Sequence, residues 1–262
     1  MGRYLRTLLR FWSTALASQT EYQANLVFDL LAIGGNLAGS LFVMGLFFQG
    51  GRSLGGWTWP EALVVLGVYS MLDGIANTFL RPNLSRIVTH VQEGTLDFVL
   101  IKPIDSQFWL SSRTFALGGL PEILSGLALM GWAAVVAGAH PTPASLGAAA
   151  LLLLASLTIL YSLWFLLATT SIWFVKTWNA TEVLRATLTA GRYPISAYPE
   201  TLRMLFTVVV PVAFLTTVPA EAILGRPSWT WLLAGGGMAL GFFALSRWFW
   251  RRALRSYTSA SS

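Results

Sequence analysis

Cysteine is absent from the 262-residue sequence, and histidine occurs only at His90 and His140. The absence of cysteine excludes disulfide bonds and thiol chemistry. The two histidines lie far apart along the chain, so no cluster of histidine and cysteine ligands has the spacing of a metal site. We therefore expect this chain to carry no metal ion or other cofactor.

A phosphate-binding loop of the form G-x-x-x-x-G-K-[ST] is also missing. Without it, the chain is not expected to bind and hydrolyse ATP in the manner of P-loop proteins. The H-E-x-x-H pattern of zinc proteases is absent as well. These absences predict that the chain is not an enzyme.

Charged residues are scarce, at 11% of the sequence, whereas hydrophobic residues make up 55%. Soluble domains carry about 25% charged residues, so we expect an all-α integral membrane protein in contact with lipid. The net charge of +6 would also suit a nucleic-acid partner. However, the basic residues mark the ends of apolar runs and do not form one aromatic-laced patch, so no nucleic acid is expected.

Residues 1–20 have helical periodicity. Apolar and basic residues separate onto two faces, which predicts an amphipathic helix lying on the membrane surface. The apolar face holds Leu5, Leu8, Leu9, Trp12 and Leu16, and the other face holds Arg3, Arg6 and Arg10. A cleaved signal is the alternative, because Ala-Leu-Ala precedes Ser18, but Arg10 interrupts the apolar core that such a signal needs.

A helix that crosses a membrane needs about 20 mainly apolar residues. Five segments qualify: residues 26–48, 61–80, 116–139, 147–174 and 229–250. The first and last contain the GxxxG patterns "GNLAG" (35–39) and "GMALG" (237–241). Such patterns indicate close packing, either within the chain or against a second subunit.

The region 175–228 has two interpretations. Hydropathy alone places a helix at residues 204–224 and leaves 176–203 as a loop. Alternatively, residues 179–198 cross the membrane, and Pro211 and Pro219 break the stretch 200–225 into a re-entrant pair. In the second case Glu182 and Arg185 have the spacing of an ion pair. Both interpretations give six crossings and place both termini on one side.

The basic residues predict which side this is, because short cytoplasmic loops are enriched in lysine and arginine. On the hydropathy interpretation, 15 of the 17 basic residues lie inside, and only Arg52 and Arg226 lie outside. The re-entrant interpretation moves Arg192 and Arg203 outward and leaves 13 of 17 inside. Both termini and the connection 81–115 are therefore expected to be cytoplasmic.

The connection 81–115 combines charged and apolar residues. Its pattern predicts a short amphipathic helix that ends near Gly94 and a second turn closed by Pro103. Composition leaves two interpretations open: a solvated loop with an interfacial helix, or a docking surface for a cytoplasmic partner.

The stretch "EGTLDFVLIKPID" (93–105) resembles the signature that follows the second helix in permeases of ABC type-2 exporters. "GRYPISAYPETLRMLF" and "PVAFLTTVPAEAILG" resemble the segment before the last helix in that family, and the ending "RRALRSYTSASS" resembles its small six-helix bacterial branch. The resemblance implies one permease domain at 21–262, in the bacterial plasma membrane. It also favours the re-entrant interpretation, on the extracellular side.

In that family the connection after helix two is a coupling helix that enters a groove of the ATPase. By resemblance, this role belongs to Glu93, Gly94, Thr95, Leu96, Asp97, Lys102 and Pro103. Leu96, Phe98 and Leu100 would fill the groove. The implied partners are a cytoplasmic P-loop ATPase dimer, which binds ATP and Mg, and a second, non-identical permease. The implied mechanism is alternating access.

Three acids lie at membrane depth: Asp29, Asp73 and Glu122. Such groups are candidates for a substrate pathway by default; Asp29 shares a helical face with Asn36, and Asp73 shares one with Asn77. Asp29 and Glu122 also lie near helix ends, where solvation at the interface would explain them. The same acids allow an alternative function, a proton-coupled secondary transporter; a membrane scaffold or enzyme subunit is a third. The aromatic-rich helices suit an amphiphilic cargo, although lipid-facing surfaces carry the same residues.

Overall fold

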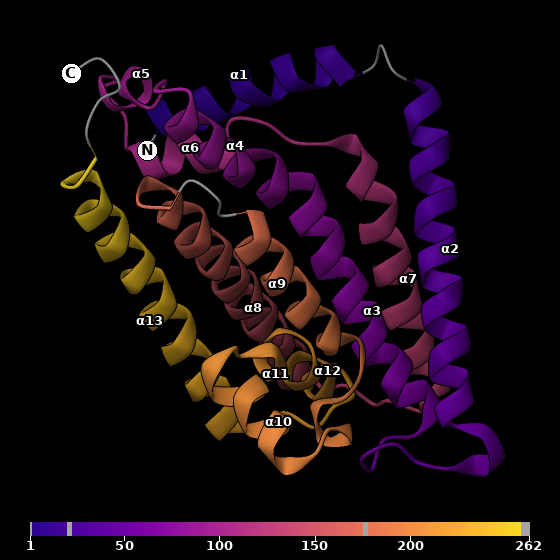
Figure 1. Ribbon diagram of the computed structural model, residues 1–262. Helices are drawn as coiled ribbons and strands as arrows, with labels where there is room; N and C mark the ends of the chain where they lie inside the picture. The colour runs from indigo at the N-terminus through magenta and orange to yellow at the C-terminus, as the bar shows by residue number, and fades with distance from the viewer. Residues whose placement is uncertain (1, 20–22, 175–177, 258–262) are drawn as a thin grey trace.

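A computed structural model describes residues 2–19, 23–174 and 178–257, and its main elements are all helices (Figure 1). The first seven are α1 (Gly2–Gln19), α2 (Gln23–Phe47), α3 (Trp59–Ile75), α4 (Arg81–Gln92), α5 (Asp97–Leu100), α6 (Ser106–Ser112) and α7 (Leu120–Val136). The others are α8 (Pro143–Thr169), α9 (Trp178–Leu188), α10 (Glu200–Met204), α11 (Val212–Leu215), α12 (Thr217–Ile223) and α13 (Trp229–Leu254).

Five helical runs in the described residues are long and apolar enough to cross a membrane. They are Val27–Phe47, Trp59–Gln92, Leu117–Val136, Pro143–Ile172 and Trp229–Leu254. A sixth candidate is the pair Glu200–Val209 and Val212–Ile223, which is bent by 68° and is either a broken span or a re-entrant loop. Each of the five segments predicted from hydropathy therefore overlaps one of these candidate runs.

The predicted crossing helix at 179–198 is shorter in the structure. Helix α9 ends at Leu188, a 3-10 turn covers Thr189–Arg192, and the chain is extended at Tyr193. Pro194 explains this end, because a residue before proline is pushed out of the helical region. Glu182 and Arg185 do form the expected pair, at 3.9 Å.

The two ends of the bundle differ in their content (Figure 1). One end carries the start of α1, the C-terminal end of α4, the helices α5 and α6, and the last residues of α13. The other end carries α10, α11 and α12. Helix α1 lies across the first end. It is held there by aromatic contacts, with Tyr4 edge-on to Phe108 at 4.8 Å and Trp12 packed against Phe79 at 5.6 Å.

Helix α3 forms the centre of the molecule, and all residues from Ala62 to Leu72 are buried. Glycines let α7 approach it closely. A Cβ atom at Gly67 would lie 2.6 Å from the backbone nitrogen of Met130, and one at Gly74 would lie 2.6 Å from that of Ile123. Close backbone approach through small residues is the usual way in which helices associate in lipid.

The two GxxxG patterns do not take part in this packing. A Cβ atom at Gly35, Gly39, Gly237 or Gly241 would have no neighbouring group within 4 Å in the described chain. The sequence left open whether these glycines pack within the chain or against a second subunit. Close packing within the described chain is therefore wrong for them.

Helices α3 and α4 are joined by a π-helical turn, Ala76–Leu80, into one run of 34 residues, Trp59–Gln92. The sequence predicts a helix that ends at residue 80 and a separate short helix after it. The run continues through Pro82 because the carbonyl of Thr78, to which Pro82 has no N–H to donate, accepts the N–H of Ala116 at 2.8 Å instead. Asn83 then fixes the start of α4, since its amide donates to the Phe79 and Thr114 carbonyls.

Candidate functional site

The coupling segment, residues 93–103, begins with a sharp turn at the end of α4. The Thr95 N–H donates to the His90 carbonyl at 2.9 Å, and the Gly94 N–H donates to the Val91 carbonyl at 3.3 Å. This pair of hydrogen bonds is a Schellman motif, which requires a left-handed residue. Gly94 fills that position with φ +66°. The predicted helix end near Gly94 is confirmed by this geometry.

After the turn, the coupling segment separates into buried and exposed residues. Leu96 and Val99 are 0% and 1% exposed, whereas Phe98 and Ile101 are 66% and 78% exposed. Glu93 and Lys102 are exposed beside them. The segment thus presents two apolar side chains between two opposite charges.

The burial of Leu96 changes the role expected for it. Leu96 lies in the core and cannot fill a partner's groove in this conformation, and Leu100 is only partly exposed. Phe98 and Ile101 are the apolar residues available to a partner. The sequence did not single out Ile101, although its three-residue spacing from Phe98 puts both side chains on one face of a helical turn.

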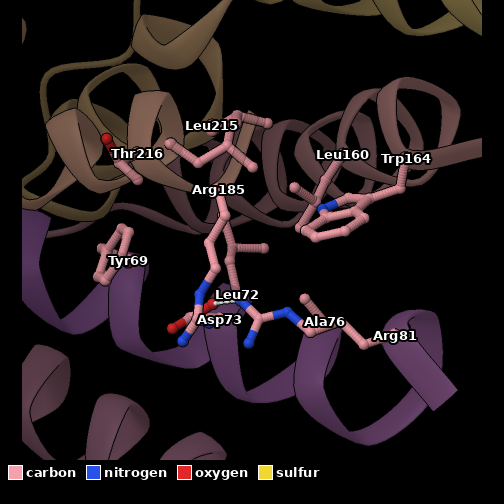
Figure 2. Close-up of a pocket in the computed structure, with 11 residues that line it drawn as sticks. Tyr69, Leu72, Asp73, Ala76, Arg81, Leu160, Trp164, Arg185, Leu215 and Thr216 are labelled. Carbon is pink, nitrogen blue, oxygen red and sulfur yellow. Dashed lines mark hydrogen bonds and ion pairs between the residues drawn. The ribbon is translucent and has the colours of Figure 1, made fainter. Parts of the chain in front are cut away.

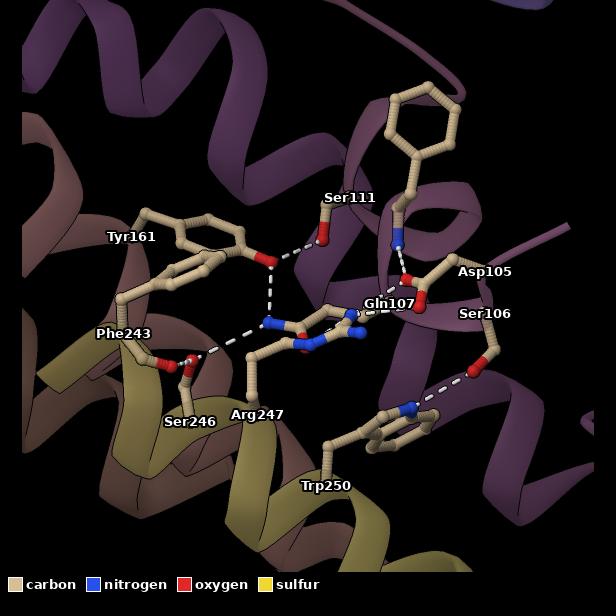
Figure 3. A network of polar contacts seen from close by, with 10 residues as sticks. Asp105, Ser106, Gln107, Ser111, Tyr161, Phe243, Ser246, Arg247 and Trp250 are labelled. Carbon is tan, nitrogen blue, oxygen red and sulfur yellow. Dashed lines mark hydrogen bonds and ion pairs between the residues drawn. The ribbon is translucent and has the colours of Figure 1, made fainter. Parts of the chain in front are cut away.

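Behind the coupling segment, α6 is fastened to α13 (Figure 3). Asp105 caps α6 by accepting the Phe108 N–H at 2.9 Å, and it also accepts from the Arg247 guanidinium at 2.8 and 2.9 Å. The Trp250 indole donates to the Ser106 hydroxyl at 3.0 Å. These contacts connect the residues that directly follow the coupling segment to the last helix.

Gln107 extends this network toward α8. Its amide donates to the Tyr161 hydroxyl at 3.0 Å, and the Tyr161 hydroxyl is 2.9 Å from that of Ser111 (Figure 3). The sequence alone did not single out Gln107, Tyr161 or Ser111 as partners. The available signal was Arg247, a charge inside the apolar stretch 229–250, which must find a polar partner if it is not to face lipid.

The acids at membrane depth form a chain of contacts with one arginine. Arg81 pairs with Asp73 at 2.7 Å and also donates to Asn77. The Asn77 amide in turn donates to Glu122 at 2.6 Å. Two of the four predicted pathway residues, Asp73 and Asn77, are thus joined by Arg81, and Asn77 continues the chain to Glu122 on α7. Arg81 was not among the residues predicted for the pathway.

The other two predicted pathway residues lie apart from this chain. Asn36 accepts from Arg192 at 3.0 Å, and Ser40 beside it accepts from the same guanidinium at 3.2 Å. Asp29 is exposed on α2 and lies against Gly118. Asp29, Asp73 and Glu122 therefore do not form one continuous proton path, and the secondary-transporter alternative is not favoured.

Asp73 and Arg81 line a small pocket between α3, α8 and α9 (Figure 2). Arg81 lies over the ring of Trp164, 5.6 Å from its centroid. The Trp164 indole nitrogen and the Arg81 Nε are buried without a partner in the described chain. The cavity has a volume of about 30 Å³, which suffices for about two water molecules. In this conformation the pocket is too small to hold a substrate.

One catalytic-type spacing does occur in the sequence, because residues 51–55 read G-x-S-x-G. In hydrolases this serine lies on a sharp turn between a strand and a helix. Here Ser53 is exposed in the irregular connection between α2 and α3, so that context is missing. Among the described residues, no group of three histidine, aspartate or glutamate side chains converges on a point where they could hold a metal.

Comparison with known proteins agrees with this architecture. A family model described as ABC-2 family transporter protein matches residues 35–261, which include the helical bundle, the coupling segment and the bent pair. Neither the curated proteins nor the solved structures contain a match. The chain therefore belongs to the ABC-2 family of transporter proteins, as a multi-pass membrane permease.

Proposed function

We propose that the chain is the transmembrane subunit of an ATP-driven exporter and that a separate P-loop ATPase dimer binds ATP and Mg. Its family supports a partner of this kind. The observation that carries the proposal is the uninterrupted helix Trp59–Gln92, which runs through the buried centre of the bundle and ends at the coupling segment.

The length of this helix suits a mechanical role. At 1.5 Å per residue, 34 residues extend about 51 Å, whereas the hydrocarbon core of a bilayer is about 30 Å thick. The helix therefore extends well beyond the membrane on the side of the coupling segment. A displacement of its end is transmitted to the core, because rigid packed helices move as units.

The surface of the coupling segment fits a groove with charged rims. Phe98 and Ile101 would enter the groove of the ATPase, and Glu93 and Lys102 would pair with charges beside it. Leu96 and Val99 are buried beneath them and would transmit a movement of the ATPase to the helical bundle. Asp97 is less suited to contact a partner, because it is only partly exposed and already interacts within the chain.

The distribution of basic residues supports a cytoplasmic position for the end that carries the coupling segment and both termini. Helix α1 would then lie in the inner membrane interface, and the bent pair Glu200–Val209 and Val212–Ile223 would be a re-entrant loop on the outer side of the plasma membrane. A second permease, non-identical by resemblance, would complete the pathway, and alternating access would move the substrate.

Removal of the two exposed apolar side chains tests the proposal. We expect Phe98→Ala with Ile101→Ala to reduce the amount of ATPase that co-purifies with the permease by about tenfold or more, because aromatic and aliphatic side chains that fill a pocket anchor such interfaces. Glu93→Lys should reduce it by reversing one rim charge. The measurement is quantitative co-purification from the native membrane.

Phe28→Ala serves as the matched control, because Phe28 is an apolar residue of α2 with 71% exposure, outside the coupling segment. It should leave co-purification unchanged. If the double variant retains its ATPase at the level of this control, the coupling segment is not the docking site. If no nucleotide-hydrolysing protein accompanies the native chain, the exporter proposal is wrong.

A further inference from the structure

A second cavity lies at the opposite end of the bundle from the coupling segment. Its volume is about 380 Å³, and α10, α12 and the start of α13 contribute to its wall. Helices α10 and α12 both lie at that end in Figure 1. Unlike the small pocket at Asp73, this cavity has the size of a small-molecule site.

One carboxylate on the wall of this cavity forms no salt bridge with another described residue. The Glu221 side chain, which is partly buried, forms no ion pair in the described part of the chain. Arg226 is the cation nearest in sequence, but its guanidinium pairs with Glu61 and lies over the ring of Trp57, 6.0 Å from the centroid. Glu221 therefore lies beside the open space without a cation in ion-pair contact, and Arg226 attracts it only from a greater distance.

The other charges on the wall cancel. Glu200 and Arg203 face the same cavity and pair with each other. With Glu221 included, the charged residues of the wall sum to −1. An anionic ligand would be repelled, whereas a cation would find an attractive site of low polarity.

Most of the remaining wall is apolar, with two threonines, Thr207 and Thr217. Trp231 is 40% exposed and packs edge-on to Phe214 at 5.4 Å. Met204 and Val208 line the same space. A carboxylate and an indole that line one cavity can together bind an organic cation, through charge and through cation–π attraction. Hard metal ions need several oxygen ligands, and this wall offers too few.

We propose that this cavity binds a monovalent organic cation with an apolar body, with Glu221 as its counter-ion and Trp231 as its aromatic wall. If the chain is an exporter, the cavity lies on the outer part of the route and the cation is a cargo, and this step rests on the proposed function. The binding itself does not require an ATPase.

The test uses two hydrophobic ions of the same shape and opposite charge, tetraphenylphosphonium and tetraphenylborate. Their binding to the purified full-length chain in neutral detergent is measured by equilibrium dialysis. We expect Glu221→Gln to weaken binding of the phosphonium by about tenfold or more and to leave binding of the borate unweakened. Trp231→Leu should also weaken binding of the phosphonium, through loss of the ring.

Glu182→Gln is the control, since it makes the same chemical change on α9, outside the cavity, and should leave both ions unaffected. Circular dichroism and gel filtration confirm that each variant is folded. Equal binding of the phosphonium to the native chain and to Glu221→Gln overturns the site but leaves the exporter proposal standing. Normal binding with export that does not depend on ATP overturns the exporter proposal and leaves the site.

Discussion

At the scale of single residues, Gly94 illustrates how one backbone conformation shapes the coupling segment. Its φ of +66° turns the chain sharply after α4, so that Leu96 points into the core while Phe98 points outward. A side chain in this region of backbone conformation is strained, and asparagine tolerates it better than alanine does. The turn therefore depends on the residue type at this one position.

We expect Gly94→Ala to lower the free energy of unfolding by about 1 kcal/mol and Gly94→Asn to lower it less. Loss of co-purifying ATPase should follow the same order. Gly147→Ala is the matched control, because a Cβ atom there meets nothing within 4 Å and alanine favours a helix. Equilibrium unfolding in mixed micelles measures the difference. Equal stability of the native chain and Gly94→Ala would argue against the strained turn.

The Asp105–Arg247 pair is the second residue-scale feature with a measurable effect. Its two side chains are 32% and 31% exposed, and loss of either partner leaves the other in a partly desolvated position. We expect Asp105→Asn and Arg247→Gln each to lower the free energy of unfolding by about 1–2 kcal/mol.

Because the two residues are in contact, the double variant should cost less than the sum of the two single variants. Glu182→Gln, which breaks the longer and more exposed pair with Arg185, should have no measurable effect. Additive losses in the double-mutant cycle would show that Asp105 and Arg247 do not stabilise each other.

At the scale of helices, hydropathy sufficed to predict five spans, because a long apolar run in lipid has to be a helix. It did not predict the continuity of α3 and α4, since Pro82 and the charges after it are equally typical of a loop. The helix from residue 179 and its pair of Glu182 with Arg185 were predicted on one of the two interpretations. Its end was placed too late, because that end depends on Pro194.

The packing of α3 on α7 was not predicted either, although a signal was present. Gly67 and Gly74 are seven residues apart, as are Gly119 and Gly126 on the facing segment. This spacing places each pair on one helical face. The GxxxG patterns at Gly35 and Gly237 pointed to other helices as candidates for close packing. A pattern within one helix does not reveal which helix it meets.

We expect Gly74→Ala to lower the free energy of unfolding by about 1–3 kcal/mol, because the new methyl group would overlap the backbone of Ile123 and push α7 away. Gly131→Ala on α7 is the control, since its Cβ would face open space. Both variants are compared by unfolding in mixed micelles. A loss no larger than that of Gly131→Ala would contradict the close contact of α3 and α7.

At the scale of the whole molecule, the candidate site was only partly predictable. The coupling segment could be recognised because its residues are contiguous in the sequence. The chain of Asp73, Arg81, Asn77 and Glu122 could not be assembled, because Glu122 comes from a different helix. Likewise, Glu221 and Trp231 meet at one cavity only through the fold of the bent pair against α13.

The lack of cysteine makes the orientation of the molecule directly testable. We expect Ser53→Cys to react with a membrane-impermeant maleimide on intact cells, because Ser53 is exposed in the connection between α2 and α3. The native Ile101 side chain is 78% exposed, so Ile101→Cys should also react, but only after the cells are permeabilised. Reaction of Ile101→Cys on intact cells would show that the coupling segment lies outside and that the proposed topology is inverted.

The π-helical turn at Ala76–Leu80 accommodates one extra residue within the central helix. Such a turn holds one residue more than an α-helical turn does, and each residue of an α-helix advances the chain by about 100°. Deletion of a single residue inside the π-helical turn would therefore leave an ordinary α-helix of nearly the same length, with Phe98 and Ile101 facing nearly the same way. Deletion of a residue elsewhere in the helix would instead rotate both side chains by about 100°.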